Sequence, residues 1–267
     1  MTRQKAVIDY FKEHGLALDY EARNGLYDLV VTCSDVIIQK NIRRSKIILV
    51  QEGMADPEDW KYHIVKKLRL ARGFASTSMT GLSNAYTYFC VASEGFRDFF
   101  ARRGADPEKI LVTGIPNFDN FAEFARRSTF PCEHYILVTT SDSRETTRYE
   151  NRKRLIRRAL EIADGRLVIF KLHPYENHGR ATREIRLWAP DALIFIDGNT
   201  AAMIANCDVL IATYSSTVLA GVALGKEVYS RYDIDELRRL VPLQHGRAAQ
   251  NIAEVCRCVL EESPVHA

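Results

Sequence analysis

The sequence predicts an α/β protein built from two parallel sheets that face each other across a cleft. Short runs of β-branched and aromatic residues, bounded by Gly, Pro, Asp or Ser, alternate with helical patterns along almost the whole chain. The runs are apolar at nearly every position, which is typical of parallel strands covered on both faces. A stretch containing Gly and Pro near the middle separates two such series, so we expect two units.

The strands and helices follow from the period of the apolar residues, which is short and continuous in strands and three to four positions in helices. In the first half, the predicted strands are 29–32, 46–50, 87–92 and 110–113, and the predicted helices are 3–13, 58–71 and 94–103. In the second half, the predicted strands are 135–139, 167–171, 192–196, 208–212 and 227–230. The helices there are 121–127, 148–163, 181–188, 201–206, 218–224 and 248–261.

A domain boundary is predicted after the fourth strand. The stretch Gly114-Ile115-Pro116-Asn117-Phe118-Asp119 has the composition of a linker, because Pro and Gly interrupt regular elements. The second series of strands begins at Tyr135. We therefore predict a first domain over 1–117, a linker over 118–134 and a second domain over 135–267. A cleft between two domains is a preferred place for a ligand.

Composition excludes several classes of protein. The chain has 267 residues and a net charge of +3, so a general nucleic-acid binder is not indicated. The six cysteines are scattered without zinc spacing, which predicts reduced thiols and no metal site. No apolar run approaches the ~20 residues that cross a bilayer. The amphipathic start differs from a signal peptide, so we expect a cytoplasmic protein.

The predicted strand over 208–212 ends in a hydroxyl-rich loop, Thr213-Tyr214-Ser215-Ser216-Thr217, which opens a helix. Hydroxyl groups and backbone N–H groups at such a turn can bind phosphate. A simple Ser or Thr N-cap would explain one of these hydroxyls but not the whole run. The fingerprints of dinucleotide-binding and P-loop proteins are absent from the sequence.

Two other strands of the second half end in polar residues. Lys171-Leu172-His173-Pro174 follows the strand over 167–171, and ligands of α/β proteins lie beyond such strand ends. His173 can donate to phosphate or act as a general acid, and Pro174 fixes the turn that directs it. Thr140 and Ser141, after the strand over 135–139, are further candidates for binding an anion. The competing interpretations are a histidine that only caps its strand and a solvated loop with an N-cap.

The first half contributes one acid at a strand end. Gln51-Glu52-Gly53 follows the strand over 46–50. A carboxylate facing the cleft could take a proton from an attacking hydroxyl, whereas the alternative is a surface glutamate before a glycine turn.

A basic amphipathic helix is predicted within 60–72. Trp60, Ile64 and Leu68 share one face, and lysine and arginine residues are concentrated in the same segment. Such a helix can lie on an anionic membrane. It can also place its apolar face in the core and leave its basic face in water.

Several motifs resemble a known group of enzymes. The block DVLIATYSSTVLAGVALGKEV, from Asp208 to Val228, resembles the donor-site segment of CDP-glycerol glycerophosphotransferases. The stretch from Tyr86 to Asp119, with VASE, KILVTGIP and FD, is similar to the end of their first domain. The pairs His173-Pro174 and Ser215-Ser216 resemble those of bacterial polysialyltransferases and capsule Kdo transferases. These families have the GT-B architecture, two Rossmann-like domains with the active site between them.

The resemblance spans roughly residues 27–262 and implies roles for individual residues. The first domain would lie on the acceptor side and the second would bind the nucleotide donor. His173 would contact and protonate the leaving phosphate, and Ser215 and Ser216 would bind it. Lys171, Pro174, Thr140, Ser141, Tyr214 and Thr217 would complete the donor site. Glu52-Gly53 matches the acidic-Gly motif whose acid is the catalytic base of polysialyltransferases.

The sequence also departs from these families. Its first domain is shortened, since it lacks the opening strand, and the helix over 218–224 contains no acid to hold a ribose. Glycerophosphotransferases tend to have His-Gly where this chain has Glu52-Gly53, which favours sugar transfer.

The resemblance therefore implies an inverting, metal-independent glycosyltransferase without a cofactor. Its donor would be a CMP-linked sugar such as Kdo or sialic acid, and its acceptor a bacterial surface glycan or a lipid-linked glycan. The alternatives are a CDP-glycerol glycerophosphotransferase, a UDP-sugar 2-epimerase and a non-catalytic nucleotide-binding module.

Overall fold

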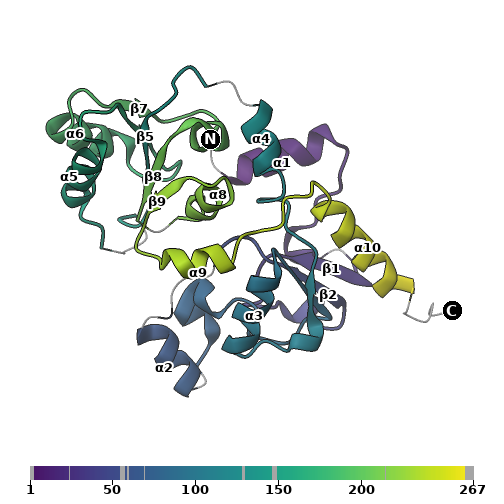
Figure 1. Ribbon diagram of the computed structural model, residues 1–267. Helices are drawn as coiled ribbons and strands as arrows, with labels where there is room; N and C mark the ends of the chain where they lie inside the picture. Colours follow the sequence, from purple (N-terminus) through teal and green to yellow (C-terminus); the bar gives the residue numbers. More distant parts are fainter. Residues whose placement is uncertain are drawn as a thin grey trace.

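The computed structural model describes residues 3–23, 25–54, 58, 60–68, 70–127, 130–145, 149–213 and 215–261 of the chain. Figure 1 shows two α/β layers, one above the other, each with its own sheet. One sheet has four strands and the other has five, and all the printed strand pairs are parallel. The predicted fold class is therefore confirmed.

The N-terminal sheet has the strand order β1-β2-β3-β4. Its strands coincide with the predicted apolar runs to within two residues at either end. They are β1 (Leu29–Thr32), β2 (Lys46–Val50), β3 (Tyr88–Val91) and β4 (Ile110–Val112). The helices of this half are α1 (Arg3–Glu13), α2 (Trp60–Leu68), α3 (Glu94–Arg103), and the 3-10 turns η1 (Tyr20–Ala22), η2 (Lys40–Ile42), η3 (Arg72–Met79) and η4 (Pro107–Lys109).

The C-terminal sheet has the order β7-β6-β5-β8-β9, with β5 in the middle. Strands are added on one side of β5 up to β7 and on the other side from β8, so the strand order reverses between β5 and β8. In α/β proteins such a switch point opens a crevice at the carboxyl ends of the strands. The strands are β5 (Ile136–Thr139), β6 (Val168–Lys171), β7 (Leu193–Phe195), β8 (Val209–Ala212) and β9 (Glu227–Tyr229). The helices are α4 (Phe121–Arg127), α5 (Arg152–Ala163), α6 (His178–Trp188), α7 (Thr200–Asn206), α8 (Thr217–Ala223), α9 (Ile234–Arg239) and α10 (Ala248–Glu261).

Asparagine caps determine where three helices begin. The side chains of Asn151, Asn177 and Asn199 accept hydrogen bonds from backbone N–H groups three residues further on. Each cap satisfies a donor that the first helical turn leaves unpaired. Because Asn177 caps α6, this helix begins at His178, earlier than the prediction of residue 181.

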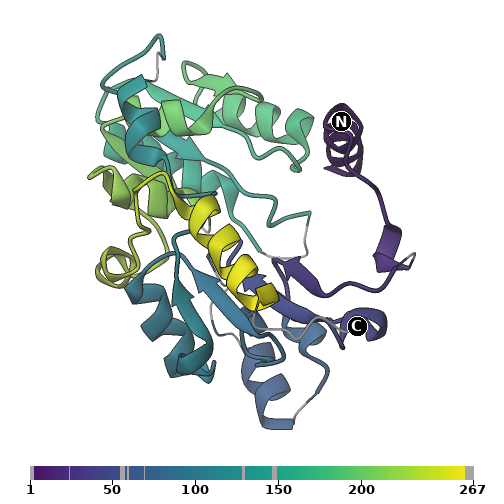
Figure 2. The same ribbon diagram turned by 90° about the vertical axis from the view of Figure 1, so that its right-hand side faces the viewer.

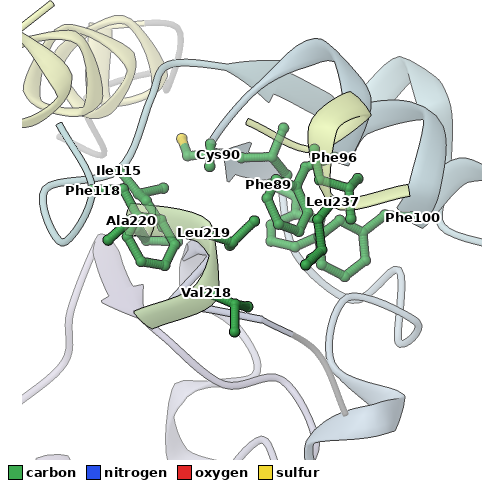
Figure 3. Close-up of a cluster of buried hydrophobic side chains, with 14 of the residues drawn as sticks. Phe89, Cys90, Phe96, Phe100, Ile115, Phe118, Val218, Leu219, Ala220 and Leu237 are labelled. Atoms are coloured by element: carbon green, nitrogen blue, oxygen red, sulfur yellow. The ribbon is translucent and has the colours of Figure 1, made fainter. Parts of the chain in front are cut away.

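The two sheets are joined by a continuous apolar core. Figure 3 shows Val218, Leu219 and Ala220 of α8 lying among side chains of both domains, including Phe89 and Phe96. Leu210 on one face of the C-terminal sheet belongs to this core, whereas Ile136 and Val138 on the other face pack under α5 and α6. The helix that carries the hydroxyl-rich loop is thus fixed against the neighbouring domain.

Helix α9, which the sequence did not predict, fastens the domains together. A β-carbon on Gly95 of α3 would lie only 1.8 Å from the carbonyl oxygen of Arg239, so this contact requires glycine. Ser93 also donates through its hydroxyl to the carbonyl of Leu240. Beyond α9, the chain returns to the N-terminal domain, where Asn251 of α10 donates to the carbonyl of Thr113 (Figure 1).

Helix α2 presents its predicted apolar face to solvent. Trp60 and Leu68 are 68% and 62% exposed, and Ile64 is also exposed. Tyr62 and Val65 of this helix are buried. The interpretation that Trp60, Ile64 and Leu68 pack in the core is therefore wrong. None of the helices in the described part of the chain has the length and apolar content of a membrane span.

Candidate functional site

The hydroxyl-rich loop after β8 is held by its own side chains. Thr217 donates from Oγ1 to Oγ of Ser215 (2.9 Å), and Thr139 on β5 lies 2.9 Å from Thr217 Oγ1. Ser215 Oγ also accepts from the backbone N–H of Thr217. Ser216 differs, because its side chain is exposed and makes no capping hydrogen bond. Tyr214 lies outside the described residues.

Gly53 of the N-terminal domain lies directly opposite this loop. An ideal β-carbon on Gly53 would be 3.9 Å from Cβ of Ser216, which is ordinary van der Waals contact. The structure thus brings together the predicted acceptor-side turn and the predicted phosphate loop, which are far apart in the sequence. Glu52, the predicted base, is exposed at this junction.

A buried glutamine, which the sequence did not single out, holds the Glu52-Gly53 turn. Gln51 donates from Nε2 to the carbonyl of Gly53 (2.9 Å) and accepts at Oε1 from the backbone N–H of Ala92 (2.9 Å). Asn117 donates to the carbonyl of Glu52 (2.8 Å). Cys33 lies in the segment after β1, and the pKa of its thiol is raised mainly by burial. The negative charge of the nearby Glu52 raises this pKa further. The sequence feature that could have identified Gln51 is its position directly after an apolar strand.

His173 lies on a tight turn after β6, as predicted. Its backbone N–H donates to Thr140 Oγ1 and to Glu176 Oε1, both at 2.9 Å. Its ring Nδ1 accepts from the backbone N–H of Tyr175 (3.3 Å). That bond places the proton of the neutral ring on Nε2, so the outer nitrogen is a hydrogen-bond donor. Pro174 is exposed at the turn.

Three predicted phosphate ligands have their side chains engaged inside the domain. Thr140 donates to Glu176, and Ser141 donates to Glu150 at 2.6 Å. Lys171 donates to the carbonyls of Leu172 and Ile196, and its burial lowers the pKa of the ammonium group. These side chains hold the strand ends in place, and their direct contact with a phosphate stays a prediction.

A buried ionic cluster supports the His173 turn from below. Arg152 pairs with Glu150 Oε1 at 2.6 Å and with Glu176 Oε2 at 2.9 Å, and all three side chains are almost completely buried. Both oxygens of Glu176 are thereby occupied, one by Arg152 and one by Thr140 and the His173 N–H. This cluster was not predicted from the sequence, because Glu176 lies 24 residues from Arg152 and only the fold brings it beside the nearby Glu150 and Arg152.

The strand β5 links both loops of the site. Thr139 contacts Thr217 on the β8 side, and the adjacent Thr140 contacts His173 on the β6 side. Strand β5 pairs with β6 on one edge and with β8 on the other, which is why its end can anchor the loops that follow both neighbours. The His173 turn and the Ser215-Ser216 loop are therefore positioned by one element.

A cationic cavity of about 910 Å³ adjoins this site. It lies between α5 and the ends of β8 and β9, where Thr213 and Arg231 line it. The cations of α5 that line the same cavity are Lys153, Arg154, Arg157 and Arg158. Glu150 and Glu161 also line it, but Glu150 is paired with the buried Arg152, and the cations outnumber the two carboxylates. The first turn of α5 contains no acid to offset the positive end of the helix dipole. The arrangement favours binding of an anion. The sequence feature that indicates this cavity is the basic segment RKRLIRR, residues 152–158.

No group of three or more His, Cys, Asp or Glu side chains suited to a metal ion occurs among the described residues. Comparison with family models gave no match, and comparison with curated proteins gave none either. Similar solved structures do exist.

The UDP-GlcNAc 2-epimerase of Neisseria meningitidis, bound to UDP-GlcNAc, is similar with a TM-score of 0.56 and 10% identity over 95% of this chain and 80% of that chain. The Methanocaldococcus jannaschii UDP-GlcNAc 2-epimerase, in complex with UDP-GlcNAc and UDP, has a TM-score of 0.54 and 12% identity, with coverages of 95% and 79%. The wall teichoic acid polymerase TagF, soaked with CDPG, has a TM-score of 0.52 and 13% identity, with coverages of 88% and 72%. At these identities the likeness shows the fold alone. The chain has the GT-B fold, with a four-stranded first domain facing a five-stranded second domain.

Proposed function

We propose that this protein is an inverting, metal-independent glycosyltransferase whose donor is a nucleotide-activated sugar of the CMP-linked kind. The observation that supports the proposal is the proximity of Gly53 and Ser216, since a β-carbon added to Gly53 would lie 3.9 Å from Cβ of Ser216. In the proposal, Glu52 is the base, and the loop that contains Ser216 binds the phosphate at the junction of the two domains. His173, on the same side of the second sheet, presents a donor nitrogen.

The proposed reaction is a single displacement at the anomeric carbon. A hydroxyl of the acceptor glycan transfers its proton to the Glu52 carboxylate as its oxygen bonds to that carbon. The bond from the anomeric carbon to the phosphate oxygen breaks, and the electron pair leaves with the nucleotide. His173 Nε2, Ser215 and Ser216 stabilise the charge on the departing phosphate, and donors of this kind often provide the largest catalytic effect.

The cationic cavity beside Thr213 supports an anionic donor. In this proposal the donor is a substrate and no cofactor takes part. The acceptor is a bacterial surface glycan or a lipid-linked glycan, and contact of residues 60–72 with a membrane belongs to the same proposal. The protein would then act in the cytoplasm at the inner face of the membrane.

Calorimetry with CMP, CDP, UMP and UDP tests the donor site. We expect cytidine-selective binding that His173→Ala weakens and that His134→Ala leaves unchanged. His134 is a matched control, because it is 83% exposed and precedes the amino end of β5. Absence of nucleotide binding would overturn the proposal.

Turnover assays then separate the related activities. Release of CMP from a CMP-sugar in the presence of EDTA, dependent on an acceptor and lost in Glu52→Gln, is the expected result. Consumption of CDP-glycerol would show glycerophosphate transfer instead. Conversion of a UDP-sugar without an acceptor would show an epimerase, and binding without turnover of any donor would show a non-catalytic module.

A further inference from the structure

The N-terminal domain exposes several large apolar side chains. Ile37 and Phe74 are 76% and 71% exposed, and Leu70 is also exposed. On α2, Trp60, Ile64 and Leu68 are exposed as well, and their spacing of four residues puts them on one side of the helix, which we call the apolar face. Exposed apolar clusters of this kind mark surfaces that bind a protein, a ligand or a membrane.

The orientation of α2 is set by its buried side. The Tyr62 ring is 1% exposed and lies 4.9 Å from the guanidinium carbon of Arg103. Lys66 donates to the hydroxyl of Tyr62 (3.1 Å) and to the carbonyl of Arg103 (3.0 Å). These contacts fix the helix on the domain, so the outward direction of the apolar face is a feature of the fold.

A groove of about 880 Å³ runs beside this face. It lies between the segment after β1 and the segment that joins α2 to η3, and Ile47 of β2 contributes to its lining. The other apolar residues that line it are Val36, Ile37, Ile38, Leu70, Ala71, Phe74 and Ala85. A volume of several hundred Å³ with an apolar lining suits a small apolar ligand or one chain of a lipid.

Two arginines, Arg43 and Arg72, line the groove, and its lining residues in the described part of the chain include no carboxylate. Arg43 donates from Nε to the carbonyl of Ile38, and Arg72 donates from Nη2 to the carbonyl of Asp35, each at 3.2 Å. The carboxylate of Asp35 is buried and accepts from the backbone N–H groups of Gly81 and Ser83. Both guanidinium groups are therefore held at the groove by backbone carbonyls, and no carboxylate among its described lining residues neutralises them.

We propose that this groove is a lipid site that takes one hydrocarbon chain, while Arg43 and Arg72 bind the anionic head group. The apolar face then enters the interfacial region of the same membrane leaflet. Charge complementarity selects an anionic lipid surface over an uncharged one, and juxtamembrane lysine and arginine residues strengthen such binding.

The groove belongs to the N-terminal domain, and its link with the transfer reaction rests on the proposed function, which assigns the acceptor to this domain. Figures 1 and 2 show α2 on the side of the N-terminal domain remote from the C-terminal domain. A lipid bound in the groove would therefore hold the acceptor-side domain at the membrane while the C-terminal domain faces away from it.

Vesicle sedimentation with the full chain tests the site. We expect binding to phosphatidylcholine vesicles that contain phosphatidylglycerol, and little binding to pure phosphatidylcholine. The variant Ile37→Ser/Phe74→Ser should lower the partition coefficient about tenfold or more, because the apolar contact is lost. Arg72→Gln should lower it about fivefold, on the anionic vesicles only. Leu187→Ser is the matched control, since Leu187 is 71% exposed on α6, and it should change nothing.

Tryptophan fluorescence gives a second readout. The sequence has two tryptophans, so Trp188→Phe leaves Trp60 as the only one. We expect lipids brominated on the acyl chain to quench Trp60, and Ile37→Ser/Phe74→Ser to abolish the quenching while the melting temperature is unchanged.

Three results would overturn the proposal. They are no binding of wild type to the anionic vesicles, equal loss in Leu187→Ser, or a dimer that Ile37→Ser/Phe74→Ser dissociates while vesicles stay unbound. Nucleotide calorimetry on the same variants separates this failure from failure of the proposed function, because it reports the donor site without lipid.

Discussion

Gly53 and Ser216, from different domains, approach so closely that a β-carbon on the glycine would touch the side chain of the serine at 3.9 Å. The backbone of Gly53 is held from behind by the buried side chain of Gln51. Ser216 is held by the short helix that packs into the core shared by both domains. The two domains therefore approach closely at this point, where a glycine and a serine face each other.

A larger side chain at position 53 should fill this space. We expect Gly53→Leu to weaken nucleotide binding at least tenfold, because it would occupy the space in front of Ser216. Gly53→Ala should bind almost normally, since its β-carbon meets only ordinary van der Waals contact. Calorimetry measures the affinity and thermal unfolding checks the fold. Equal affinity in Gly53→Leu and wild type would show that the donor does not pass this point.

The two serines of the loop should respond differently to alanine. Ser215 accepts two hydrogen bonds from Thr217, so Ser215→Ala should cost about 1 kcal/mol in the free energy of unfolding. Ser216 is exposed and makes no capping bond, so Ser216→Ala should leave stability unchanged and weaken nucleotide binding. Urea unfolding and calorimetry on both variants measure the two effects. The reverse pattern would contradict the assignment of Ser216 to the ligand.

Removal of the His173 ring should affect turnover more than folding. We expect His173→Ala to lower kcat about 100- to 1000-fold, as the loss of one donor to a developing charge does elsewhere. Stability should change little, because the bonds to Thr140 and Glu176 come from the backbone N–H, which alanine keeps. A variant with full turnover would remove His173 from the mechanism.

Glu176 should matter for stability first. Removing one partner of a buried ion pair costs about 3–5 kcal/mol, so Glu176→Ala should destabilise strongly by urea unfolding. Glu161→Ala is the control, because Glu161 is exposed and lies 3.6 Å from Arg158 on the same helix. Glu176→Gln keeps part of the network, so it should fold, with a lower kcat and an unchanged Kd for nucleotide. An unchanged kcat would mean that Glu176 does not position His173.

Alkaline pH should destabilise the protein through its buried thiols. Burial raises the pKa of Cys207 from 9.0 to about 12. Above pH 9 the unfolded chain releases this proton while the folded chain keeps it, so the free energy of unfolding falls as pH rises. Between pH 9 and pH 10, the free energy of unfolding of Cys207→Ala should fall by about 1 kcal/mol less than that of wild type, as measured by urea unfolding. Cys258→Ala is the control, because Cys258 is exposed. If the free energy of unfolding fell equally in wild type and Cys207→Ala, the Cys207 thiol would not cause the loss of stability at alkaline pH.

The strands and their grouping into two sheets were predictable, because runs such as 135–139 and 208–212 are continuously apolar and clearly bounded. The positions of His173 and of the 213–217 loop followed from the same rule about strand ends. Helix α9 was not predicted because it has only six residues. The one sequence feature that indicates its start is the N-cap residue Asp233.

The partners of the polar side chains were not predictable. Thr140 and Ser141 have the hydroxyls expected of an anion site, yet they bond to Glu176 and Glu150, which lie elsewhere in the chain. Local sequence gives no measure of such distant contacts. Helix α2 shows the same limit, since Tyr62 and Val65 compete with Trp60 and Ile64 for the core and only packing decides between them.

The core shared by both layers has a consequence for dissecting the protein. Cutting the chain near residue 130 would separate Val218 and Leu219 from Phe89 and Phe96 (Figure 3). Each half would then expose apolar side chains that are buried in the intact protein. The halves would therefore be poor soluble fragments. A chimera that joins the second half to the first domain of another protein would fold only if that domain offers the same packing surface. In this protein Phe89, Phe96 and Gly95 form the surface against which α8 and α9 pack.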